Sequence, residues 1–472
     1  MNDQDTHDYY FESPNARLVV LIIVCIGSFL TPLSLSATLV AIPAIARDLH
    51  ADAVYVSWIP ATFLLSNLVT LLPAGRLADI YGRKRIYLLG TIVFLLGSLL
   101  AALSTTIHTL LFFRAVQGIG AAMFFSTGMA IITSVFQNKG RGAALGWVVA
   151  AVYTGLTCGP FLGGWLTDVY GWRSVFLFQA PLALAGIILI LLKMKGEWRS
   201  AGALKVDFIG AAFLSIWLIA LFIGVSKLPD WKAYLALVIT AIFLYLFLRH
   251  TRRSPNAIIK LKVVWENRVF SHAMLASLAM YGGQYGLIFI LGLYLQYNKG
   301  MSPTEAGRMI MLQAVIMAIL APMSGRLSDN YKPWLLAAAG CISASIGIAL
   351  LLFVNVTDSL WLMGAALLFI GVGFGLFSTP NNSAALGAVS KERLGMASAL
   401  LTMSRLMGQM LGTAIVTLLM SLMIGATKIT PDQYDSLLVV FLSTALISLV
   451  FSVSGIYFCL INRNVPSSSH QS

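Results

Sequence analysis

Long apolar segments separated by short polar ones follow one another along almost the whole chain. A helix needs about 20 apolar residues to cross a hydrocarbon layer of about 30 Å, and fourteen segments of this sequence reach that length. The segments are 18–45, 53–74, 87–105, 109–136, 142–168, 174–192, 207–226, 232–249, 269–297, 303–323, 335–355, 359–386, 396–424 and 436–461. The pattern therefore predicts an all-α polytopic membrane protein with fourteen transmembrane helices.

One polar loop occurs twice and divides the chain. Gly75-Arg-Leu-Ala-Asp-Ile-Tyr81 follows the second apolar segment, and Gly325-Arg-Leu-Ser-Asp-Asn-Tyr331 follows the tenth, with five identical positions in seven. Each copy lies between the second and third segments of a set of six, so we infer a duplication in a 6+2+6 plan. The predicted parts are a cytoplasmic N-terminal tail at 1–17, a six-helix bundle at 18–192, a two-helix insert with basic cytoplasmic loops at 193–268, a second six-helix bundle at 269–461 and a cytoplasmic C-terminal tail at 462–472.

Composition excludes several classes of protein. Only 10% of the residues are charged and 58% are apolar, against about 25% charged in soluble domains, which excludes a soluble enzyme. The 31 Lys and Arg residues form short clusters between apolar segments, which argues against a nucleic-acid-binding surface. They are about three times as frequent on alternate polar segments, starting with the N-terminal one, and this predicts cytoplasmic termini. We expect a multi-pass protein of the inner (cytoplasmic) membrane of a prokaryote.

Two further features argue against a secretory leader and a metal centre. The first sixteen residues contain no Lys or Arg, and the apolar segment that follows is too long for a signal peptide. The cysteines lie far apart inside apolar segments, without a Cys-x-x-Cys or Cys/His spacing, at Cys25, Cys158, Cys341 and Cys459. We therefore expect the N-terminus to be retained, and we expect no disulfide, no metal and no cofactor.

The first copy of the polar loop, extended to Arg85, combines glycines, one carboxylate and a basic cluster. Gly75 and Gly82 permit tight turns and close backbone approach. Asp79 stands next to a helix end, where it can bond the exposed amides of a neighbouring helix start. The alternative is a plain topogenic charge cluster, which would not require the glycine spacing or the second copy.

This stretch resembles the signature loop of the major facilitator superfamily. The resemblance implies that the loop acts as a latch between the two bundles in alternating access, through Gly75, Asp79, Gly82 and Arg83. In the second copy Asp329 is kept, but Lys332-Pro333 replaces the Gly-Arg pair. The resemblance therefore implies a weaker second latch.

An arginine lies inside the fourth apolar segment, in Arg114-Ala-Val-Gln117-Gly-Ile-Gly120. A guanidinium within the membrane costs about 2.5–3.5 kcal/mol even on the lenient insertion scale, so a function is the default hypothesis. The motif is similar to a second signature of the same superfamily, which implies a role for Arg114 and Gln117 in proton coupling. The alternatives are an arginine that snorkels outward, or one satisfied by carbonyls and Gln117.

The fifth segment contains a run of small residues at four-residue spacing, with a proline inside it: Gly155, Gly159, Pro160, Gly163 and Gly164. Such spacing lets helices pack backbone to backbone. The run resembles the antiporter motif of exporters, and together with Asp168 and Trp172-Arg173 it resembles the fourteen-span drug:proton antiporter branch. The resemblance implies export of small amphipathic compounds coupled to protons. Generic helix packing is the alternative.

The sequence departs from that branch in one respect. Where the branch carries an acidic residue in its first span, this chain has Ser34, and no carboxylate lies near the centre of any apolar segment. The embedded charges are Arg114 and Arg405, both positive. We therefore expect a substrate that is anionic, zwitterionic or neutral and amphipathic, and Asp79 or His272 stay as candidate proton carriers.

Transporters with internal repeats bind substrate near the membrane midplane, where the repeats meet. Polar and aromatic side chains near segment centres are therefore predicted to line the substrate cavity. They are Ser34, Tyr281, Gln284, Tyr285, Asn381, Asn382 and Gln409. Two glycines between Tyr281 and Gln284 suggest a loosened helix, and Pro380 suggests an unwound one, although aromatic packing and a simple kink explain these features too.

Three functions were weighed on this basis. The favoured one is export of small amphipathic compounds by alternating access and proton antiport, by a monomer that contacts a small-molecule substrate, protons and the lipid bilayer but no nucleic acid. The second is uptake or uniport of an anionic or zwitterionic metabolite by the same fold. The third is a membrane-bound enzyme or sensor, for which the sequence offers no Gly-x-x-x-x-Gly-Lys loop, no metal cluster and no soluble domain. We therefore expect a transporter and no enzymatic activity.

Overall fold

The computed structural model describes most of the chain. The described residues are 10, 13–136, 140–199, 206–254, 257–259, 264, 267–354, 359–390 and 393–461. The predicted C-terminal tail at 462–472 lies outside them, as do most of the N-terminal tail and parts of the basic loops around the insert.

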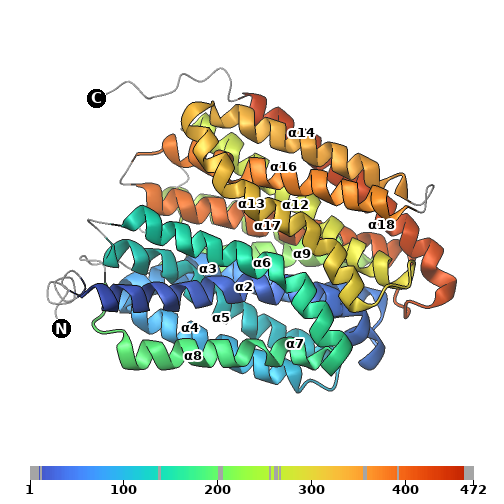
Figure 1. Ribbon diagram of the computed structural model, residues 1–472, viewed down its shortest axis with the longest axis horizontal. Coiled ribbons are helices and arrows are strands. Elements are labelled where there is room, and N and C mark those ends of the chain that lie inside the picture. The colour runs from blue at the N-terminus through green and yellow to red at the C-terminus, as the bar shows by residue number, and fades with distance from the viewer. Residues whose placement is uncertain are drawn as a thin grey trace. The chain divides into compact units, whose positions relative to one another are not determined.

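Within these residues the protein is helical and has no strand (Figure 1). Fourteen helical stretches are long and apolar enough to cross a membrane, which confirms the predicted number. The helices are α2 (Pro14–Asp48), α3 (Ala53–Tyr81), α4 (Arg83–Ala102), α5 (Ile107–Val135), α6 (Arg141–Tyr170), α7 (Arg173–Leu177), α8 (Gln179–Lys193), α9 (Phe208–Ser226), α10 (Trp231–Arg253), α12 (Arg268–Tyr297), α13 (Pro303–Asn330), α14 (Pro333–Leu351), α16 (Leu360–Gly387), α17 (Leu394–Met423) and α18 (Tyr434–Ile461). The sixth span consists of α7 and α8 in succession.

Several helices run beyond their predicted apolar segments. α3 continues seven residues past position 74 to Tyr81, and α13 continues past position 323 to Asn330. An apolar count detects only the stretch in hydrocarbon, whereas a helix bonds its own backbone and can continue through polar residues. Consequently the duplicated loop is itself helical over most of its length.

Helix starts are set by local side chains. Asp52 Oδ1 accepts a hydrogen bond from Tyr55 N at 2.8 Å and caps α3. At the start of α13, Ser302 N donates to Glu305 Oε2 at 2.8 Å and Glu305 N donates to Ser302 Oγ at 3.2 Å. This reciprocal pair is a capping box.

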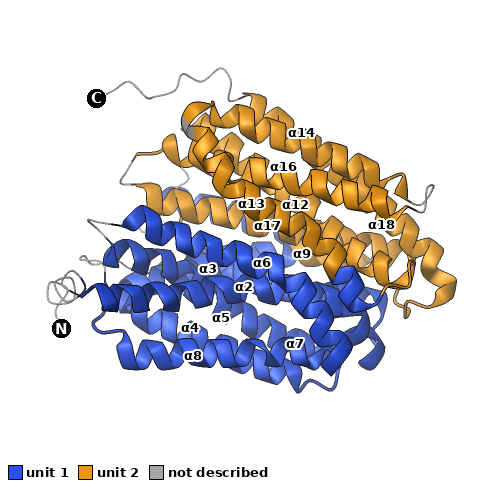
Figure 2. Cartoon of the chain, in the orientation of Figure 1, with its two compact units in different colours: residues 1–221, 236–258, 302–307 blue, residues 222–235, 259–301, 308–472 orange. Residues whose placement is uncertain are grey.

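The chain divides into two compact units (Figure 2). Unit 1 contains residues 1–221, 236–258 and 302–307, and unit 2 contains residues 222–235, 259–301 and 308–472. In unit 1, α2 packs on α6 and α8, and α4 packs on α5 and α8. In unit 2, α12 packs on α17 and α18, and α14 packs on α16 and α18. The first helix of each set thus packs on the fifth and sixth, and the third on the fourth and sixth, as the repeated loop leads one to expect.

The insert helices α9 and α10 are joined at one end by a buried carboxylate. Asp207 accepts hydrogen bonds from Gly210 N at 2.8 Å and pairs with His250 Nε2 at 2.7 Å. Along α10 an apolar face is largely exposed, including Leu235, Val238 and Ile242. A helix face of this kind suits contact with hydrocarbon.

Candidate functional site

The signature loop, residues 75–85, contains one true turn. Gly75 lies inside α3, where a Cβ would meet Ser126 Cβ at an ordinary 3.9 Å, so the prediction of a turn at Gly75 is wrong. Gly82 separates α3 from α4 with φ of +116°, a conformation that side chains disfavour. A Cβ at Gly82 would also lie 2.3 Å from Glu197 Cδ. The positive φ therefore favours glycine at position 82, and any side chain there would also displace the Glu197 side chain.

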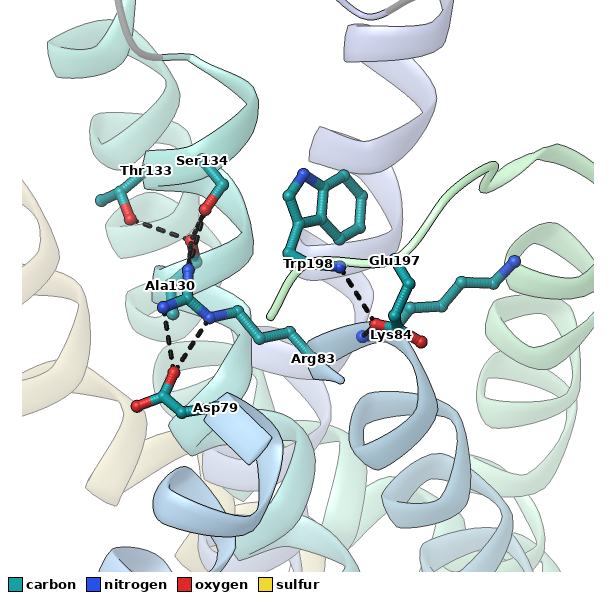
Figure 3. Close-up of polar contacts among 8 residues, drawn as sticks. All are labelled: Asp79, Arg83, Lys84, Ala130, Thr133, Ser134, Glu197 and Trp198. Carbon is teal, nitrogen blue, oxygen red and sulfur yellow. Dashed lines mark hydrogen bonds and ion pairs between the residues drawn. The ribbon is translucent and has the colours of Figure 1, made fainter. Parts of the chain in front are cut away.

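Asp79 and Arg83 form an ion pair across this turn (Figure 3). Arg83 Nη2 lies 3.0 Å from Asp79 Oδ1, and Arg83 Nη1 donates to Ser134 Oγ at 2.8 Å and to the Ala130 carbonyl at 3.2 Å. Arg83 therefore ties the end of α3 to the far end of α5. Within unit 1 Asp79 Oδ1 is bonded to the guanidinium of Arg83, and the predicted role of Asp79 in capping a neighbouring helix start stays a prediction.

The start of α4 is capped instead by Glu197, four residues beyond the end of α8. Its Oε1 accepts from Lys84 N at 2.7 Å (Figure 3). Its Oε2 accepts from Arg85 N at 3.3 Å, and the Trp198 carbonyl accepts from Arg83 N at 3.0 Å. A carboxylate at a helix N-terminus satisfies orphan amides and complements the helix dipole. Glu197 is not among the predicted site residues, although it is the only acidic residue between Lys193 and Asp207.

The loop of unit 2 is built differently. The side chain of Asp329 lies outside the described part of the structure, so its predicted role in a latch stays a prediction. α14 begins at Pro333 and its start has no side-chain cap. Proline has no amide and its φ is already helical, so it suits the first position of a helix. Because Pro333 has no amide proton, the start of α14 has one backbone donor fewer that needs a hydrogen-bond acceptor.

Arg114 is fully buried on α5, two turns from the helix start. Its Nη1 donates to Gln117 Oε1 at 2.5 Å and to Ser34 Oγ at 3.0 Å, and its Nε donates to the Ile59 carbonyl at 3.4 Å. The Phe63 ring lies 4.5 Å from its guanidinium carbon. The structure thus brings the predicted residues Ser34, Arg114 and Gln117 together, and full burial contradicts the alternative of an outward-snorkelling arginine.

Gln117 extends this cluster to two more helices. Its Nε2 donates to Ser98 Oγ on α4 at 2.7 Å and to Gln179 Oε1 on α8 at 3.0 Å. Gln179 in turn donates to the Val175 carbonyl at 2.9 Å. Ser98 and Gln179 were not predicted as site residues, although a glutamine within the sixth apolar segment was a visible signal. A buried polar network of this kind fixes the relative positions of the helices it joins.

One face of the antiporter stretch, residues 155–164, lies directly against α2. A Cβ on Gly155 would lie 2.4 Å from the Phe29 carbonyl, and one on Gly163 would lie 2.4 Å from the Ala37 carbonyl. Between them, a Cβ on Gly159 would lie 1.8 Å from Ser36 Oγ. No side chain fits at these three positions unless α6 and α2 move apart.

The other face of the stretch contacts the first turn of α13, which also belongs to unit 1. A Cβ on Gly164 would lie 2.3 Å from the Pro303 carbonyl, and one on Gly307 would lie 2.2 Å from the Pro160 carbonyl. One turn further along α6, Asp168 Oδ2 accepts from Thr304 N at 2.8 Å and also from the Thr304 hydroxyl. The glycines of α6 therefore serve two helix contacts at once.

In unit 2 the glycines beside Tyr281 do not loosen the helix as predicted. α12 is continuous from Arg268 to Tyr297. A Cβ on Gly412 would lie 2.1 Å from the Gly282 carbonyl, and one on Gly286 would lie 2.8 Å from the Gly412 carbonyl. These glycines allow α12 and α17 to pack closely, just as the antiporter stretch allows α2 and α6 to do.

The two asparagines of α16 have separate partners. The helix continues through Pro380, so the predicted unwound backbone is wrong. Asn381 is buried, and its Nδ2 donates to the Ala273 carbonyl at 3.0 Å and to Ser277 Oγ at 2.9 Å. Asn382 instead accepts a hydrogen bond from Arg405 Nη2 on α17.

The remaining predicted cavity residues are half-buried in unit 2. Tyr281 bonds Ser378 Oγ through its hydroxyl at 3.1 Å. Gln284 faces a small apolar cavity within the unit, while Tyr285 follows it on α12 and Gln409 lies on α17. Among the described residues no group of three or more His, Cys, Asp or Glu side chains could hold a metal ion.

These features define a polytopic membrane transporter built from repeated helix sets. The chain belongs to the Major Facilitator Superfamily, whose sequence profile matches residues 24–413. It is 30% identical over 401 residues to the riboflavin transporter RibZ of Clostridioides difficile (strain 630), covering 84% of this chain and 87% of that protein. It is also 30% identical over 418 residues to the multidrug resistance protein Stp of Mycobacterium tuberculosis (strain CDC 1551 / Oshkosh), covering 87% of this chain and 77% of that protein.

A solved structure shares the fold. It is a bacterial homologue of the human lysosomal transporter Spinster, crystallised in an inward-facing and unoccupied conformation. The TM-score is 0.69 at 19% sequence identity, with 95% of this chain and 97% of that chain covered. At this identity the likeness establishes the fold alone.

Proposed function

We propose that the protein is a secondary active transporter that exports small amphipathic compounds by alternating access, driven by proton antiport. It acts as a monomer in the inner membrane of a prokaryote, with both termini in the cytoplasm. The observation that carries the proposal is the antiporter stretch of α6, whose glycines contact α2 on one face and the start of α13 on the other. The similarity to a multidrug resistance protein supports export.

The charges of the spans support a substrate that is not a net cation, that is, an anionic, zwitterionic or neutral compound. By sequence no carboxylate lies near the centre of an apolar segment, whereas Arg114 and Arg405 lie within spans. A cation would meet positive charge in such a protein and would find no acidic ligand. The similarity to a protein named as a riboflavin transporter supports the same reading, because riboflavin carries no cationic group at neutral pH.

Proton coupling is proposed to depend on the Arg114 network, which has no side chain that titrates near neutral pH and therefore transmits a change made at a separate proton carrier, Asp79 or His272. Arg114 and Gln117 join five helices through one set of hydrogen bonds, so a change in one partner alters the others. The test is a pH-jump transport assay in proteoliposomes with wild type and Arg114→Ala. Transport of an amphipathic probe in the variant that still responds fully to the pH gradient would refute this role.

The antiporter stretch is tested by substitution within one helix. Gly163→Val places a side chain against the α2 backbone, while Gly146→Val on the same helix meets nothing within 4 Å and is the matched control. Overpacking costs about 1–3 kcal/mol of stability. We therefore expect gradient-driven efflux to fall in Gly163→Val, where α6 cannot keep its contact with α2, and to stay near wild type in Gly146→Val. Equal efflux in the two variants would contradict the proposal.

The second candidate function is uptake or uniport of an anionic or zwitterionic metabolite by the same fold. The observation that favours it is the 30% identity to a protein whose name gives riboflavin as its substrate but no direction of transport. Counterflow in proteoliposomes separates the two. Net transport that is independent of an imposed pH gradient supports uniport, and accumulation inside proteoliposomes whose lumen is more acidic than the outside supports antiport.

A further inference from the structure

The two embedded arginines have different surroundings. Arg114 is fully buried, and its guanidinium donates to three oxygens within unit 1. Arg405 on α17 is only half-buried, and its Nη2 donates to Asn382 Oδ1. Its Nε is buried but has no hydrogen-bond partner. Within the described part of the chain no carboxylate pairs with Arg405.

A guanidinium within a membrane span needs hydrogen-bond acceptors. A guanidinium has five donors in a planar fork, and two of them can bind the two oxygens of one carboxylate. Arg405 uses one donor on Asn382, which leaves its remaining Nη protons for a ligand, while its buried Nε has no partner. Ionisable side chains within membrane spans mark substrate pathways by default. The unused hydrogen-bond donors of Arg405 therefore suit this side chain to bind a substrate.

Its neighbours suit an amphipathic anion. The Tyr281 ring lies 5.5 Å from the Arg405 guanidinium carbon, and the Tyr281 hydroxyl is held by Ser378 Oγ at 3.1 Å. An aromatic ring held in this way offers a flat apolar surface next to the charge. The Asn382 side-chain nitrogen is a further donor beside the guanidinium. The charge of Arg405, the amide donor of Asn382 and the ring of Tyr281 come from α17, α16 and α12, which all contribute these residues to unit 2.

We propose that Arg405, Asn382 and Tyr281 form an anion-binding subsite for the carboxylate or sulfonate group of an aromatic substrate. The acidic group lies on the free edge of the Arg405 fork, and the aromatic body of the substrate lies against Tyr281. The subsite rests on the proposed transport function and adds a substrate class to it. It requires neither a particular direction of transport nor proton coupling.

The test is dye binding by the full-length protein in phosphatidylcholine nanodiscs, which contain no anionic lipid. The probes are fluorescein, which carries a carboxylate, and rhodamine 123, which shares the xanthene rings but is a cationic ester. Removing one partner of a buried charged hydrogen bond costs about 2–5 kcal/mol, so Arg405→Gln is expected to weaken fluorescein binding at least about 30-fold. Binding of rhodamine 123 is expected to change less than about threefold.

Two more variants complete the design. Arg249→Gln removes an exposed arginine from α10 and is the matched charge control, with fluorescein affinity unchanged. Asn382→Asp keeps the shape of the side chain but places a carboxylate beside Arg405, where it competes with the ligand. This variant is expected to lose at least about tenfold in fluorescein affinity without loss of rhodamine 123 binding. It decides the question if Arg405→Gln fails to fold.

Two results would overturn the subsite. The first is that the wild-type protein binds no fluorescein or binds rhodamine 123 more tightly. The second is that Arg405→Gln and Asn382→Asp leave fluorescein affinity unchanged, or weaken the binding of both dyes equally. Because binding is measured without a gradient, failure of proton-driven export leaves this result intact. Conversely, undiminished fluorescein efflux by Arg405→Gln would remove the subsite and leave the exporter standing.

Discussion

At the scale of single residues, the signature loop shows how a motif can be recognised and its parts still misassigned. Sequence reasoning placed Gly82, Asp79 and Arg83 in one loop, and the structure brings them together. The start of α4 is capped by Glu197, which lies 113 positions from Lys84 and is not among the predicted site residues. Sequence distance hides such a contact, because spacing rules describe neighbours along one helix and not pairs between segments.

The contribution of Glu197 can be measured by two substitutions. Glu197→Ala removes both acceptors from the start of α4, and loss of a cap costs about 1 kcal/mol. Glu197→Gln keeps one acceptor and is expected to cost less. The measurement is the midpoint of thermal unfolding in detergent, with Asp432→Asn at an exposed position as control. An Ala variant as stable as wild type would show that the cap contributes nothing.

The two glycines of the signature loop are expected to respond in opposite ways. Gly82→Ala combines a positive φ with a clash against Glu197, and strain of this kind costs about 1–3 kcal/mol. Gly75→Ala adds a methyl group inside a helix with room for it, where alanine is favoured over glycine by about 1 kcal/mol. Unfolding midpoints should fall for Gly82→Ala and stay level or rise for Gly75→Ala. The reverse order would contradict the assigned geometry.

At the scale of elements, helix number was predictable and helix interruptions were not. The thickness of the hydrocarbon layer constrains the length of each span so strongly that all fourteen could be counted from hydropathy. Glycines and prolines in those spans are ambiguous from sequence, because close packing and local unwinding use the same residues. The sequence suggests a loosened helix at Gly282 and an unwound or kinked one at Pro380, and the structure has continuous helices at both.

The contact between α12 and α17 is tested by one glycine. Gly412→Ala places a methyl group 2.1 Å from the Gly282 carbonyl, whereas Gly395→Ala on the same helix meets nothing within 4 Å. Overpacking costs about 1–3 kcal/mol, so Gly412→Ala is expected to lower the unfolding midpoint clearly and Gly395→Ala is not. Equal stability of the two variants would mean that the helices separate without cost.

At the scale of the whole molecule, the repeated polar loop predicted that two halves share one arrangement. Within each unit the first helix packs on the fifth, and glycines bring the two helix backbones close together. These glycines are Gly155, Gly159 and Gly163 in unit 1, and Gly282 and Gly412 in unit 2. A repeat can be detected from the sequence alone, because one part of the chain is compared with another part of the same chain. The partner that each polar side chain binds is not visible, because it depends on which segments fold side by side.

The starts of α4 and α14 differ in a way that bears on how the repeats have diverged. In one, the first amides are met by a carboxylate borrowed from a distant segment; in the other, a proline ring is built into the backbone itself. A borrowed group can depart and return, while a ring bonded into the chain stays where it is. The start of α4 can therefore lose and regain its cap when the Glu197 segment moves, whereas the start of α14 has no side-chain cap to lose.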